Sequence, residues 1–69
     1  MTSHFNIGQS LRRVQAEKRV TNKSLATAIG VNPVQVARWR NSEDLKFSRV
    51  AQLASQFEMS VDEFVRQGA

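Results

Sequence analysis

The side chains of this chain that could do chemistry are mainly basic, and they are unevenly distributed. Residues 1–42 hold seven lysines and arginines and one glutamate, whereas residues 43–69 hold three basic and five acidic residues. Over the whole chain, ten basic residues oppose six acidic ones, which gives a net charge of +4 at pH 7. A basic first part followed by a mildly acidic second part indicates one surface that faces a polyanion and another that faces water or a protein partner.

The sequence offers no arrangement typical of catalysis or metal binding. It has no cysteine, which excludes disulfides and thiolate metal sites. The single histidine, His4, has no second ligand at a suitable spacing, and no serine, aspartate or glutamate is placed with a base as a nucleophile requires. We therefore expect no enzyme activity, no metal, no cofactor and no small-molecule ligand.

The length of 69 residues predicts a single domain over residues 1–69. A chain of this size buries roughly 60% of its surface on folding, which leaves a thin core and no room for a deep substrate cavity. No apolar run approaches the ~20 residues that cross a bilayer, and no secretory leader pattern opens the chain. We expect a cytoplasmic protein that is not associated with a membrane.

The elements that must position the basic side chains are helices, because apolar residues recur at helical spacing. A first helix is expected over about residues 6–18. Its inward residues are Ile7, Leu11 and Val14, and its outward residues are Arg12, Arg13 and Gln15. Together with four further helices, this pattern predicts an all-α domain of five short helices.

The second and third helices are separated by a very short turn. Thr21 is expected to cap the second helix, and Gly30 to end it, because glycine readily adopts the left-handed conformation common after a helix. Asn32 can then cap a third helix that begins with Pro33 and runs to about Asn41. Such a turn is too short for antiparallel packing, so the two helices must cross steeply.

Residues 22–41 therefore predict a helix-turn-helix. Small or apolar residues stand where its two helices would touch each other and the first helix. These residues are Leu25, Ala26, Ile29, Gly30, Val31, Val36 and Trp39. The spacing places Trp39 on the core side, so we expect it to be buried instead of stacking on a base.

The second part of the chain predicts two more helices after a loop over residues 42–47. Ser48 is expected to cap the fourth helix, and Ser60 and Glu63 form a capping box that starts the fifth. The inward residues are Val50, Leu53, Ala54 and Phe57 in the fourth helix and Val61, Phe64 and Val65 in the fifth.

The segment NIGQSLRRVQAEKRVTNKSLA, followed by the turn at Gly30, resembles the Cro/C1-type (lambda-repressor-like, XRE-type) helix-turn-helix family of phage repressors and bacterial regulators. The matching residues are Ile7, Gly8, Leu11, Arg12, Val14, Thr21, Leu25 and Ala26. The five-helix outline extends the resemblance to about Gln67. It implies a compact five-helix lambda-repressor-like fold that binds double-stranded DNA through its second and third helices.

In this family the third helix lies in the major groove, so the resemblance implies that residues near its start meet base edges. Arg38 could hold guanine O6 and N7 with two hydrogen bonds, or it could contact phosphate or water instead. Gln35 could pair with adenine or bind a phosphate, and Val34 could contact a thymine methyl group or be partly buried. Pro33 stands where relatives commonly carry a polar amide, which implies an unusual base preference.

Phosphate contacts position such a protein without reading the sequence. The resemblance assigns them to Asn22 and Lys23 at the start of the second helix and to Asn41 at the end of the third. Further candidates are Thr21, Arg12, Arg13, Lys46 and Arg40. Several relatives pair a helix-1 arginine with an acid where this chain has Gln15 and Arg40, so we expect Arg40 to be free to bind phosphate. A solvated surface side chain is the alternative for each candidate.

We therefore expect a sequence-specific transcriptional regulator that resembles a phage Cro or repressor DNA-binding domain. Such a domain binds a pseudo-palindromic operator as a homodimer and blocks promoter elements. The Phe47 loop, the last helix with Val61 and Val65, and residues 66–69 are expected at the dimer contact. Two alternatives stay open: a controller- or antitoxin-type regulator that also binds a protein partner, and a protein-interaction module that does not bind DNA.

Overall fold

A computed structural model of the chain describes residues 6–68, and it contains five helices and no strand in that range. The helices are α1 (Ile7–Lys18), α2 (Asn22–Ile29), α3 (Pro33–Arg40), α4 (Phe47–Gln56) and α5 (Val61–Arg66). This arrangement confirms the all-α fold of five short helices. None of the described helices is long and apolar enough to span a membrane. His4 lies outside the described residues.

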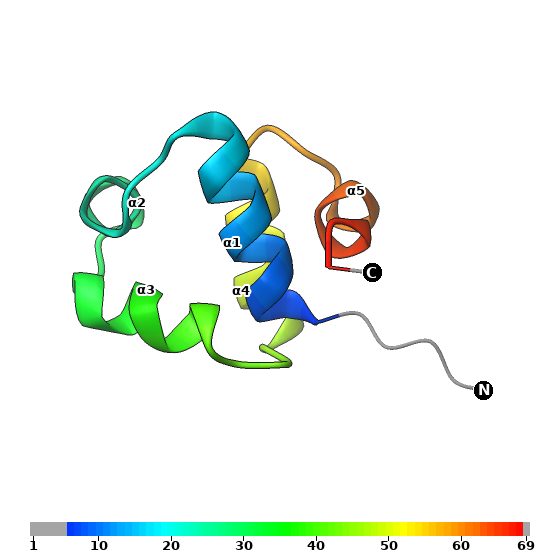
Figure 1. The fold of residues 1–69 in the computed structure, drawn as a ribbon, viewed down its shortest axis with the longest axis horizontal. Coiled ribbons are helices and arrows are strands. Elements are labelled where there is room, and N and C mark those ends of the chain that lie inside the picture. The colour runs from blue at the N-terminus through cyan, green and yellow to red at the C-terminus, as the bar shows by residue number, and fades with distance from the viewer. Residues whose placement is uncertain (1–5, 69) are drawn as a thin grey trace.

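The central helix of the domain is α1 (Figure 1). In that view α2 and α3 lie on one side of α1, α5 lies on the other side, and α4 passes behind it. Both α3 and α5 pack against α1, while α2 packs against α3 and α4 packs against α5. Because α3 has its inner side on α1, its outer side is left open.

Polar side chains cap the helices of the helix-turn-helix as predicted. Thr21 Oγ1 accepts a hydrogen bond from the amide of Ser24 at 3.0 Å, and Asn32 Oδ1 accepts one from the amide of Val34 at 2.8 Å. Gly30 ends α2 with a φ of +77°, which is the left-handed conformation expected of it. The turn between α2 and α3 therefore consists of residues 30–32, and residues 22–41 form the predicted helix-turn-helix.

The predicted cap of α4 is wrong, whereas that of α5 is confirmed. Phe47 is the first residue of α4 and Lys46 is the N-cap position, without a side-chain hydrogen bond. The carbonyl of Lys46 accepts from the amide of Val50 at 3.0 Å, so Ser48 is the second residue of the helix and caps nothing. Leu45, just before this point, packs against the core. The loop after α3 accordingly ends at Lys46.

Each helix contributes one large apolar side chain that is fully buried in the core. These side chains are Leu11, Leu25, Val36, Leu53 and Phe64. The rings of Phe57 and Phe64 stack with their centroids 6.3 Å apart, which joins the end of α4 to α5. Trp39 is 9% exposed, as the prediction of burial requires. The remaining predicted core residues are buried too, except that Ile29, Val31, Val61 and Val65 are half-buried at the edge of the core.

The start of α1 rests directly on the end of α3. The amide of Ile7 donates to the carbonyl of Glu43 at 2.9 Å, and the amide of Gly8 donates to the carbonyl of Ser42 at 2.8 Å. Gly8 is buried, and a Cβ at this position would meet the carbonyl oxygens of Arg40 and Ser42. Glycine is therefore needed for the close approach of the two helices.

Candidate nucleic-acid interface

The open side of α3 carries the four residues predicted to read bases. Pro33, Val34, Gln35 and Arg38 are all exposed, and Val34 is 58% exposed. Val34 and Gln35 stand one helical turn before Arg38, so these three side chains share one side of the helix. Within residues 6–68, the guanidinium of Arg38 forms no hydrogen bond or ion pair. The structure thus brings these side chains together on a surface that a duplex groove could reach.

A second group of predicted side chains lies at the start of α2. Thr21 is the exposed N-cap, and Lys23 is exposed on the first turn. Asn22 is half-buried, and its Oδ1 accepts a hydrogen bond from Nε2 of Gln15 at 3.0 Å. Because this oxygen is already paired, the Nδ2 group of Asn22 is the part of the side chain left to bind a phosphate.

The end of α3 differs from the expectation at Arg40. Asn41 is exposed, and its Nδ2 donates to the carbonyl of Ala37 at 3.1 Å. Arg40 is half-buried, and its Nη1 donates to Oε1 of Gln15 at 2.7 Å. Arg40 therefore does not lack a protein partner as expected, because the amide of Gln15 accepts from it. A phosphate contact by its remaining donors stays a prediction.

Gln15 is a residue of this site that the sequence interpretation missed. It was expected to point outward, yet it is only 2% exposed. The signal was present in the spacing, since Gln15 follows the fully buried Leu11 by four residues and therefore shares its side of α1. Its polar side chain suggested the surface, but three hydrogen bonds to the protein satisfy the buried amide.

The two arginines in the middle of α1 are not brought to the helix-turn-helix by any hydrogen bond among the described residues. Nη1 of Arg13 donates to the carbonyl of Gln67 at 2.8 Å, which ties this side chain to the end of α5. Arg12 is exposed. A phosphate contact by either residue stays a prediction.

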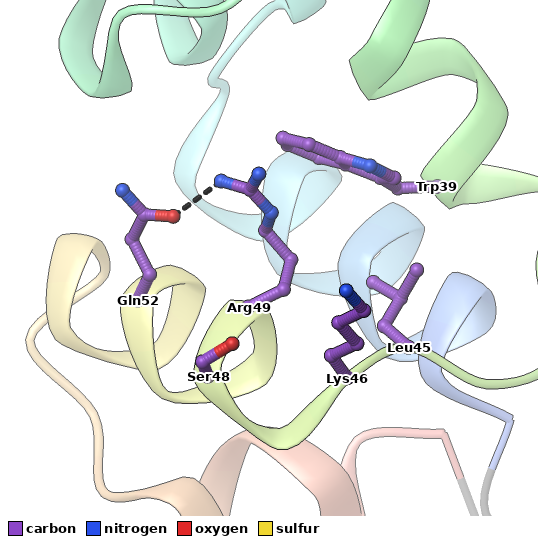
Figure 2. Close-up of a pocket in the computed structure, with 6 residues that line it drawn as sticks. All are labelled: Trp39, Leu45, Lys46, Ser48, Arg49 and Gln52. Carbon is purple, nitrogen blue, oxygen red and sulfur yellow. Dashed lines mark hydrogen bonds between the residues drawn. The ribbon is translucent and has the colours of Figure 1, made fainter.

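An open cavity of about 720 Å³ lies between α3, the loop that follows it and the start of α4. Its lining residues are Trp39, Leu45, Lys46, Ser48, Arg49 and Gln52 (Figure 2). The guanidinium carbon of Arg49 lies 4.4 Å from the centre of the Trp39 ring, and Nη1 of Arg49 donates to Oε1 of Gln52. Lys46, a predicted phosphate-binding residue, is exposed at this cavity. The pairing of Arg49 with Trp39 has no local sequence signal, because the two residues belong to different helices.

The helix-turn-helix and the end of α1 form a stretch of the chain that contains basic but no acidic residues. Residues 18–42 contain five lysines and arginines and no aspartate or glutamate. Four of these residues are exposed and Arg40 is half-buried, so the positive charge is available to a ligand. Such a surface suits a polyanion such as the phosphate backbone of DNA.

The chain matches a family model described as a Cro/C1-type HTH DNA-binding domain, over residues 10–66. The matched range contains most of α1 and all of α2 to α5. No curated protein and no solved structure gave a match.

Proposed function

Because the chain belongs to the family of Cro/C1-type helix-turn-helix DNA-binding domains, we propose that it is a repressor that occupies a pseudo-palindromic operator as a homodimer. The family consists of DNA-binding regulatory domains and not of enzymes, so the partner of the chain is double-stranded DNA. Repression by occupancy requires no cofactor and no small-molecule ligand. In this mode of repression, the bound domain covers promoter elements and so blocks transcription.

The observation that carries the proposal is the exposed side of α3. Val34, Gln35 and Arg38 lie there together. They belong to residues 18–42, which contain five basic residues and no acidic one. A short helix with exposed side chains near its start fits the major groove of B-DNA. The free guanidinium of Arg38 can form two hydrogen bonds to guanine, which is the commonest specific contact to a base.

The remaining predicted residues have positioning roles in this proposal. Thr21, Asn22 and Lys23 at the start of α2 contact phosphates on one flank of the groove. Arg40 at the end of α3, and Asn41 and Lys46 after it, contact phosphates on the other flank. Arg12 and Arg13 lie outside these two groups and add general positive potential.

A dimer is part of the proposal because one helix in one groove reads few base pairs. Phe47 is 72% exposed at the start of α4, which makes it the most exposed large apolar side chain in residues 6–68. Val61 and Val65 are half-buried and pack against the core, so they offer less free apolar surface. We place the dimer contact at Phe47, with α5 as its neighbour.

We also propose that the chain is a phage Cro-like repressor that works in the cytoplasm of a bacterial host. The description of the matching family as Cro/C1-type supports this assignment.

The experiment that tests the proposed function is selection of bound duplexes from a random DNA library at about 0.15 M salt, followed by sequencing. Enrichment of a pseudo-palindrome with half-sites about 10 base pairs apart, centre to centre, would support a sequence-specific dimer. Enrichment of a single unrepeated site would contradict the dimer. If a folded sample enriches no sequence, the proposal is wrong and a protein-interaction module becomes the better hypothesis.

A further inference from the structure

The buried side chain of Gln15 connects both helices of the helix-turn-helix to α1. Its Nε2 donates to the carbonyl of Val20 at 3.1 Å and to Oδ1 of Asn22 at 3.0 Å. Its Oε1 accepts from Nη1 of Arg40 at 2.7 Å. One amide group thus holds the first residue of α2 and the last residue of α3 within hydrogen-bond distance.

The carbonyl of Val20 fixes the direction of this amide. A carbonyl oxygen only accepts hydrogen bonds, so the nitrogen of Gln15 must lie on the Val20 side and its oxygen on the Arg40 side. The same nitrogen meets Oδ1 of Asn22, which sets the orientation of the Asn22 amide as well. Gln15 does not pair with the Nδ2 group of Asn22 or with the Nε and Nη2 groups of Arg40. All of these groups are hydrogen-bond donors.

We propose that Gln15 is a positioning residue for DNA binding, which directs the free donors of Asn22 and Arg40 at the phosphate backbone. This inference rests on the proposed function, in which both residues contact phosphates. Two physical effects follow from the amide. Holding the side chains before binding reduces the entropy that they lose in the complex, and a neutral partner leaves the full positive charge of Arg40 for the phosphate.

The neutrality of Gln15 matters because a carboxylate of the same shape would act differently. A carboxylate would pair with Arg40 and cancel its charge, and it has no proton to donate to Val20 or Asn22. Asn22 would then turn its Nδ2 group inward and its oxygen toward the DNA, where a phosphate repels it. Within residues 6–68 no acidic side chain pairs with Arg40, so this comparison can be made cleanly.

The test uses the operator selected with the unchanged chain and two variants of the proposed positioning residue, Gln15→Leu and Gln15→Glu. Asn22→Ala and Arg40→Gln serve as reference variants. Interference by ethylated phosphates shows which phosphates each protein contacts, and Kd measured against salt concentration gives the number of phosphates neutralised.

Gln15→Leu should weaken binding about tenfold, and it should lose interference at the phosphates that the two reference variants lose. Gln15→Glu should lose the same phosphates and lower the slope of log K against log salt by about 1, because the charge of Arg40 is cancelled. Gln56→Glu, on the exposed end of α4, makes the same change of charge outside this network and should keep the interference pattern of the unchanged chain.

A purely structural role of Gln15 would give a different result. Because leucine leaves three polar groups without their partner, each variant is measured at a temperature at which circular dichroism shows it folded. If both Gln15 variants weaken interference equally at every phosphate, or leave the pattern unchanged, the positioning role is refuted. If the unchanged chain binds no duplex, the proposed function fails, and the role of Gln15 fails with it.

Discussion

The amide nitrogen of Gly8 donates a hydrogen bond to the carbonyl oxygen of Ser42 at 2.8 Å, which fastens the start of α1 to the residues just after α3. A Cβ on residue 8 would lie 2.6 Å from the carbonyl oxygen of Arg40, closer than such atoms approach in proteins. The position of α3 on α1 therefore depends on the absence of one methyl group.

Gly8→Ala should destabilise the domain although alanine is the better helix former by about 1 kcal/mol. The added methyl group forces the backbones of α1 and α3 apart, and overpacking of this kind costs about 1–3 kcal/mol. Urea unfolding followed by circular dichroism measures the change. A variant with an equal or higher unfolding midpoint would show that the two backbones separate without cost.

Arg49→Ala should lower the free energy of unfolding by about 1 kcal/mol, which corresponds to roughly 5 °C in Tm for a domain of this size. The guanidinium of Arg49 covers the Trp39 ring at 4.4 Å and is half-buried, so both the cation–π attraction and the covering of the ring are lost. Thermal unfolding provides the measurement.

Arg66→Ala is the matched control for this change. Arg66 pairs with Asp62 at 2.9 Å across one turn of α5, but its side chain is 71% exposed. Exposed pairs of this kind contribute little to stability. Equal losses of stability in the two arginine variants would contradict a special role for the stacking on Trp39.

Arg38→Ala should reduce binding to the selected operator by about 5- to 150-fold, the range expected for one lost pair of hydrogen bonds to guanine. Binding to random duplex should change much less. Lys23→Ala should weaken both kinds of binding by similar factors and lower the salt slope by about 1, since a phosphate contact is independent of sequence. If both variants change the ratio of operator binding to random-duplex binding by the same factor, Arg38 is not a base-reading residue.

Val34 gives a prediction that is tested on the DNA instead of the protein. Its side chain is exposed and has no hydrogen-bonding group, so its specific contact should be the methyl group of a thymine. Replacing that thymine with deoxyuridine removes only the methyl group and should weaken binding about fourfold, the value of one buried methylene. The Val34→Ala variant should respond much less to the same replacement. If every thymine of the operator can be replaced without loss, Val34 does not contact a methyl group.

The sequence predicted the helices well where local signals agree. Thr21 and Asn32 at helix starts, Gly30 after α2 and the Ser60–Glu63 capping box all act within a few residues, and the structure places each of them as expected. Ser48 shows the limit of such signals. A serine favours the N-cap position, but the N-cap of α4 is Lys46, two residues earlier, directly after Leu45, which packs against the core.

Contacts between helices were harder to predict, and they matter most at the site. The burial of Gln15 depends on Val20, Asn22 and Arg40 converging on one amide, and that convergence exists only after α2 and α3 have packed on α1. The hydrogen bond from Arg13 to the carbonyl of Gln67 joins two parts of the chain that are far apart in sequence. Periodicity within α1 places Gln15 on the buried side with Leu11, but it does not identify the partners of either side chain.

Trp39 is the single tryptophan of the chain, and it forms one wall of the cavity between α3 and α4. Its indole is shielded on one face by a charged group whose position depends on the neighbouring loop and helix. A ligand that attracts Arg49 or Lys46 alters the surroundings of this ring and hence its emission. The intrinsic fluorescence of Trp39, which lies beside the surface that we propose meets DNA, therefore allows DNA titrations to be followed without an attached dye.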